Sequence, residues 1–124
     1  MPEKIRTPAQ SLEAFLNAVD QCVLDYRLAA DTVNEEDRRL QDLLHAMEFA
    51  NDKAERNRVA TRLHNSRKIR RQNKDIMQQN ELIVKFFEEE QNRKVLNKLR
   101  QLLGRQRKEE EFLTGERVYK PRVK

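Results

Sequence analysis

The sequence is poor both in residues that interrupt helices and in residues that fill a globular core. It has two glycines and three prolines in 124 residues, no tryptophan, and only 37% hydrophobic residues. Long helices are therefore expected, because few residues would break them and the abundant Glu, Lys, Arg, Gln and Leu favour them. Apolar residues this sparse suit narrow seams between helices, where each well-buried Leu or Ile contributes about 1.5–3 kcal/mol.

Cysteine and long apolar runs are scarce as well. Cys22 is the only cysteine, which excludes an internal disulfide, and it lies among apolar positions as a small side chain. No apolar run approaches the ~18 residues of a membrane span. The N-terminus lacks the apolar segment of a signal peptide. We therefore expect a soluble protein of the cytoplasm that makes no membrane contact.

The residue patterns that carry catalysis are missing too. The chain has no Ser/His/Asp spacing, no glycine-rich phosphate loop and no Cys/His cluster. His45 and His64 are too far apart to form a metal-binding pair on one helix turn. The acidic runs 88–90 and 109–111 diverge by about 100° per residue on a helix. We therefore expect no enzyme activity, no catalytic residue, no metal site and no cofactor.

Apolar side chains recur at every seventh position in the first part of the chain, and this spacing predicts one long helix over residues 8–49 with a coiled-coil-like seam. Thr7, Pro8 and Gln10 have the arrangement of a capped helix start. One layer, at Glu36-Asp37, departs from the pattern. The seam positions are Leu12, Val19, Tyr26, Val33, Leu40 and Met47.

A second helix is predicted over residues 52–79, because Asp52 and Glu55 have the spacing of a capping box. The short connection before it favours an antiparallel neighbour. The seam of this helix includes Ser66 and Asn73. Polar residues in a narrow seam can fix the register of two helices at a cost in stability. The other interpretation, which we favour, is that both are hydrated residues at the seam margin.

The rest of the chain is predicted to be a broken helix over residues 81–113 and an extended basic tail over residues 114–124. The two apolar patches of residues 81–113 would point about 160° apart on one straight helix. A break within residues 88–92 resolves that conflict. The predicted fold is a single all-α domain over residues 1–124, an elongated antiparallel helical hairpin or bundle.

Charge is segregated along the chain. Residues 1–50 sum to −5 and residues 51–80 to +6, within a total of +5. On the second helix the basic residues form one stripe about 32 Å long. This basic face consists of Lys53, Arg56, His64, Arg67, Lys68, Arg71 and Lys74.

Three interpretations of the basic face remain open. It can bind the phosphates of DNA or RNA, although no aromatic residue is interleaved for base stacking. It can bind an acidic protein partner. It can also pair within the fold with acids of the first helix, at Glu13, Asp20, Asp31 and Asp42.

Two other surfaces are candidates for partner contact. One is an apolar patch at Leu82, Ile83, Phe86 and Phe87. The other is the basic tail, with contacts expected at Arg117, Tyr119, Lys120 and Arg122. The seam of the first helix is also longer than the second helix can cover. The rest of the seam is left for the last helix or for a second copy of the chain, and we expect a homodimer.

Four stretches resemble small uncharacterised α-helical proteins encoded by phages and prophages of Gram-positive bacteria. The stretches are HAMEFAN, RVATRLHNSRKIRRQNKDIMQQNELIVKFFEE, NRKVLNKLRQLLGRQRKEE and RVYKPRV, within residues 45–124. The resemblance implies a phage setting, in which small proteins without catalytic residues commonly bind and redirect a host machine. We expect a non-catalytic accessory protein that modulates or inhibits a larger host protein, such as a nucleic-acid-processing or defence enzyme. The alternative is a nucleic-acid-binding protein that uses the basic face and the tail.

Overall fold

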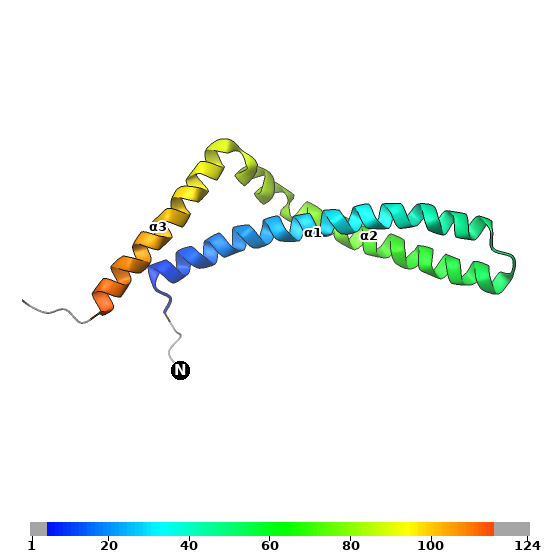
Figure 1. The fold of residues 1–124 in the computed structure, drawn as a ribbon, viewed down its shortest axis with the longest axis horizontal. Helices are drawn as coiled ribbons and strands as arrows, with labels where there is room; N and C mark the ends of the chain where they lie inside the picture. Colours follow the sequence, from blue (N-terminus) through cyan, green and yellow to red (C-terminus); the bar gives the residue numbers. More distant parts are fainter. Residues whose placement is uncertain (1–4, 116–124) are drawn as a thin grey trace, which may run out of the picture. The chain divides into compact units, whose positions relative to one another are not determined.

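The computed structural model describes residues 5–115, which form three α-helices (Figure 1). They are α1 (Pro8–Glu48), α2 (Lys53–Glu88) and α3 (Glu90–Thr114). No strand occurs among the described residues. The all-α fold is confirmed, and α1 packs against α2 as a helical hairpin. None of the helices in residues 5–115 is both long enough and apolar enough to cross a membrane.

The starts of α1 and α2 are both held by side-chain caps. The Thr7 backbone N–H donates to Gln10 Oε1 at 3.0 Å, and the Gln10 N–H donates to Thr7 Oγ1 at 3.2 Å. At α2, the Glu55 N–H donates to Asp52 Oδ1 at 2.7 Å, while the Glu55 carboxylate accepts from the Asn51 N–H. These bonds satisfy amide groups that have no partner within a first helical turn.

Helix α2 runs beyond its predicted end. The predicted boundary at residue 79 is wrong, because the helix continues through Asn80 to Glu88. Asn80 Nδ2 donates to the carbonyl oxygen of Ile76 at 2.8 Å, so this side chain is satisfied inside the helix instead of capping a new one. Val84 continues the buried side of α2 one heptad after Met77. The break lies at Glu89, inside the segment 88–92 where the sequence predicts one.

The chain packs as two compact units, and α1 contributes to both. The first unit combines residues 5–20 with residues 87–115, where α1 and α3 are antiparallel. Ion pairs join Arg107 to Glu13 at 2.9 Å and Arg100 to Asp20 at 2.8 Å. Its buried core is Ala9, Leu16, Val19, Leu96 and Leu103, with Leu12, Phe87 and Leu99 packed against it.

The second unit is the hairpin Gln21–Phe86, in which the rest of α1 runs beside α2 (Figure 1). Two contacts fix the register of the helices. Ser66 Oγ donates to Glu36 Oε2, and Arg70 Nε donates to Asp37 Oδ1 at 2.6 Å. The buried apolar residues of this unit are Ala29, Val33, Leu43, Val59 and Val84.

Candidate binding surface on helix α2

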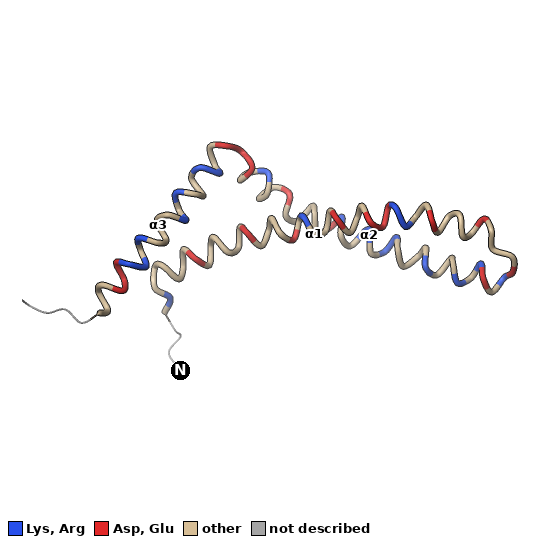
Figure 2. The backbone as a smooth tube through the Cα atoms, in the orientation of Figure 1, with Lys and Arg blue, Asp and Glu red and all other residues tan. Residues whose placement is uncertain are grey.

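All seven residues of the basic face are exposed along α2. Figure 2 shows Lys and Arg gathered on the first part of this helix. Within residues 5–115, none of the seven takes part in an ion pair or a side-chain hydrogen bond. The basic face is therefore available to an anionic partner.

Three acids of α1 form ion pairs with residues outside the basic face. Glu13 and Asp20 pair with Arg107 and Arg100 of α3, so the interpretation that these two acids neutralise the basic face is wrong. The Asp37 carboxylate binds Arg70, a residue of α2 that does not belong to the basic face.

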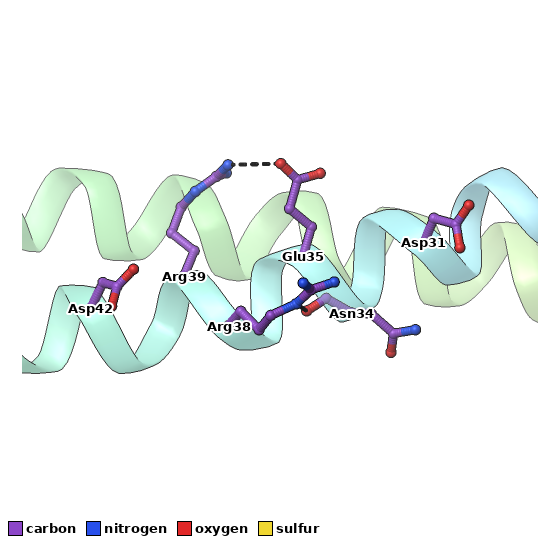
Figure 3. Close-up of a pocket in the computed structure, with 6 residues that line it drawn as sticks. All are labelled: Asp31, Asn34, Glu35, Arg38, Arg39 and Asp42. Atoms are coloured by element: carbon purple, nitrogen blue, oxygen red, sulfur yellow. Dashed lines mark hydrogen bonds and ion pairs between the residues drawn. The ribbon is translucent and has the colours of Figure 1, made fainter.

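Asp31 and Asp42 line a shallow hollow on the surface of α1, together with Asn34 and Arg38 (Figure 3). Arg39 and Glu35 form an ion pair beside them at 3.3 Å. Every residue that lines this hollow comes from α1 alone. It is a shallow depression in the surface of one helix, and no second element helps to enclose a ligand there.

The apolar patch is divided by the structure. Leu82 is 83% exposed, Phe86 is 52% exposed and Ile83 is 42% exposed. Phe87, in contrast, packs against the core of the first unit. Phe87 is therefore committed to the fold, and the other three present apolar surface to solvent.

The continuity of α2 aligns Leu82 and Phe86 with the basic face, whereas Ile83 points to another side of the helix. Phe86 follows Lys68 by five full turns at about 100° per residue, so the two lie on one side of the helix. Leu82 lies about 20° from the direction of Arg71. Leu82 lies about 12 Å beyond Lys74 along the helix axis. Cations and exposed apolar side chains therefore share one surface within one unit.

An acid also belongs to this surface. Asp75 is exposed and follows Lys74 directly, between the last cation of the basic face and Leu82. With Gln78 and Gln79 it lines a shallow depression. The surface thus changes along the helix from cationic through mixed polar to apolar.

A buried polar pair between α1 and α2 corrects the interpretation of Ser66. Glu36 is 4% exposed and Ser66 is 3% exposed, and they are hydrogen-bonded to each other. Arg39 also binds the Glu36 carboxylate. Ser66 is therefore not a hydrated residue at the seam margin. The signal was in the sequence, since the seam of α1 is interrupted at Glu36-Asp37 and that of α2 at Ser66 and Asn73. Which of these residues pair depends on the register of the two helices.

Asn73 is half-buried, and its Nδ2 donates to the carbonyl oxygen of Ile69 at 2.8 Å. The predicted tail contacts Arg117, Tyr119, Lys120 and Arg122 lie outside the described residues. Among residues 5–115, no three His, Cys, Asp or Glu side chains gather in a metal-binding arrangement.

Comparison with known proteins gives no relative for this chain. No protein-family description, curated protein or solved structure matches it.

Proposed function

We propose that this chain is a non-catalytic binding protein that docks on a larger acidic protein through the outer surface of α2. The observation that carries the proposal is the position of Leu82. A leucine that is 83% exposed lies in line with a row of cations that make no ion pair in the described chain. Such a residue gains free energy when a partner covers it, at about 25 cal/mol per Å² of apolar surface buried.

The composition of the surface favours a protein partner. Protein interfaces combine a desolvated apolar centre with a polar rim, and they are enriched in Phe and Arg. Here Leu82 and Phe86 provide the apolar centre, while Arg67, Arg71 and Lys74 provide charge that accelerates and orients the encounter. Asp75 fits a mixed protein surface better than a continuous phosphate backbone.

The phage resemblance supports a host protein as the partner. In that setting the chain acts in the bacterial cytoplasm, as an accessory protein that modulates or inhibits a host enzyme. If the partner is a nucleic-acid-processing or defence enzyme, the basic face would contact an acidic region of its surface. Regulation then follows from occupancy of the partner's surface, without any bond being made or broken by this chain.

The test is affinity isolation from nuclease-treated lysate of a Gram-positive host, with three variants alongside the wild type. Leu82→Asp should abolish recovery of the partner protein, and the triple reversal Arg67→Glu, Arg71→Glu, Lys74→Glu should weaken it strongly. The matched control reverses three exposed cations of α3, Lys98→Glu, Arg105→Glu and Lys108→Glu, and should retain the partner. The proposal would be overturned if no protein were recovered with the α3 control and lost with Leu82→Asp.

Nucleic-acid binding is the second candidate, favoured by the absence of ion pairs at the basic face within residues 5–115. If five of its cations contact phosphates of duplex DNA, the slope of log K against log salt is about −4 to −5. Titration of random duplex DNA at several salt concentrations measures that slope. The triple reversal at Arg67, Arg71 and Lys74 should then abolish binding, whereas Leu82→Asp should leave it unchanged. The response to Leu82→Asp therefore separates the two functions.

A further inference from the structure

The hairpin Gln21–Phe86 has a second exposed surface, on a different side from the basic face. Ile69, Ile76 and Ile83 recur every seventh residue along α2, and they are 38%, 36% and 42% exposed. Arg71 is only two residues after Ile69, which on a helix places it about 160° away. The three isoleucines therefore form a separate apolar line, with the heptad spacing of a helix seam.

Ile69 and Ile76 line a groove between α1 and α2, which we name the side groove. One stretch is lined by Leu43 and Ala46 of α1 and by Ile69 of α2. The next stretch is lined by Leu28 and Ala29 of α1 and by Ile76 of α2. Both stretches lie on one side of the hairpin, because positions one heptad apart differ by only about 20°.

The opposite side of the hairpin is closed. There the Arg70 guanidinium spans from α2 to the Asp37 carboxylate of α1 at 2.6 Å. Arg70 follows Ile69 directly and so lies about 100° from it on α2. The hairpin thus has one side bridged by charge and one side where apolar seam residues remain open to solvent.

The charges at the edges of the side groove identify its occupant. Asp42 of α1 and Arg62 of α2 line the same stretch from opposite edges. Neither makes an ion pair within residues 5–115. A two-fold axis parallel to the groove would lay α1 of one copy over α2 of the other. That operation brings Asp42 to the partner's Arg62, and Arg62 to the partner's Asp42. The groove is therefore complementary to itself.

We infer that a second copy of this chain covers the side groove, so that two Gln21–Phe86 hairpins form a four-helix bundle. The isoleucine lines of the two copies fill the centre of the bundle, which is the packing that heptad-spaced apolar residues support. Two reciprocal Asp42–Arg62 pairs set the pairing of the copies. The basic face and Leu82 stay on the outside, so this inference does not depend on the proposed function.

The test is the sedimentation mass of the full chain at tens of micromolar. The wild type should show twice the chain mass of 14.9 kDa. Asp42→Arg and Arg62→Asp should each weaken self-association about tenfold or more, because each places two like charges face to face. Asp31→Arg is the matched control, since Asp31 lines neither stretch of the side groove. It should keep the wild-type mass.

A mixture of the two charge-reversal variants is the decisive measurement. In the mixed dimer, Arg at position 42 faces Asp at position 62 of the other chain, and the second contact retains the natural pair. Mixing should therefore restore a dimer that neither variant forms alone, which also shows that both variants are folded. A wild-type mass of one chain would overturn the inference and leave the groove to another helix or to solvent. A wild-type dimer without recovery in the mixture would overturn this interface.

Discussion

At the scale of single residues, the contact between Glu36 and Ser66 is the feature that most constrains the hairpin. A buried carboxylate needs partners, because removal from water costs several kcal/mol when they are absent. Glu36 has two, the Ser66 hydroxyl and the Arg39 guanidinium. The pair allows one register of α2 against α1 and penalises slippage by a turn, which would leave the carboxylate buried among apolar side chains.

Ser66→Ala should lower the free energy of unfolding by about 1–3 kcal/mol, because it leaves one buried acceptor position unsatisfied. The double variant Glu36→Leu, Ser66→Ala should recover most of that loss, since apolar replacement of both partners is often nearly neutral or stabilising. Urea denaturation followed by circular dichroism measures both. A double variant less stable than the single one would show that the carboxylate contributes net stability.

Because of Glu110, the stability of the first unit should depend on pH in the acidic range. Its carboxylate accepts hydrogen bonds from the Thr7 side chain, from Gln106 Nε2 and from the Ala9 backbone N–H, and these lower its pKa below the ordinary 4.5. Because this pKa is lower in the folded state, the ionised carboxylate stabilises the fold above pH 4.5. That stabilisation is lost as the pH falls through the folded-state pKa.

The measurement is hydrogen exchange of the Ala9 amide between pH 5 and pH 3, corrected for intrinsic exchange. Protection should fall with decreasing pH in the wild type. Glu110→Gln should be less protected at pH 5 and should lose the pH dependence. Equal pH dependence in the two proteins would show that Glu110 does not act through its ionisation.

At the scale of the element, α3 contains a glycine that lowers the stability of the helix. Gly104 lies in the middle of the helix, and a Cβ built there meets no atom within 4 Å. Gly in a helix interior is less favourable than Ala by about 1 kcal/mol. Gly104→Ala should therefore stabilise the chain by up to about 1 kcal/mol, measured as a higher urea midpoint.

Gly115 provides the control for that substitution. It follows the last residue of α3, and a Cβ there would approach the carbonyl oxygen of Glu111 at 3.0 Å. Gly115→Ala should therefore not raise the urea midpoint. A destabilising Gly104→Ala would indicate that this position of α3 is covered by a partner in solution.

The length of α2 is the second feature at this scale. Asn80 is commonly found at helix ends, because its side chain competes for backbone hydrogen bonds. In α2 it bonds to the preceding turn, and the buried side continues to Val84. This continuity places Leu82 on the same surface as the basic face. A helix that ended at residue 79 would have assigned the cations and the leucine to separate surfaces.

At the scale of the whole molecule, charge is distributed between two uses. Some ion pairs connect two helices within one unit, such as Arg107–Glu13 in the first unit and Arg70–Asp37 in the second. The cations of the basic face contribute to no such pair in the described residues. Surface charges without partners usually affect stability by less than about 0.5 kcal/mol.

The triple reversal Arg67→Glu, Arg71→Glu, Lys74→Glu should therefore leave the urea midpoint nearly unchanged, although it moves the formal net charge from +5 to −1. Arg70→Ala, a single change beside them, should be more destabilising because it removes the Asp37 pair. The comparison shows which cations serve the fold. A marked loss of stability in the triple variant would assign the basic face to intramolecular contacts.

The amino-acid sequence by itself determined the all-α fold, the capped starts of α1 and α2, and the gathering of the basic face on one side of α2. These follow from local spacing, since periodicity fixes which side of a helix is apolar and neighbouring residues form the caps. Only the tertiary structure decided which side chains of the helices meet. It assigned Glu13 and Asp20 to α3, buried Ser66 against Glu36 and left the side groove open. Such contacts join residues far apart in sequence, and several pairings satisfy the same local pattern until packing selects one.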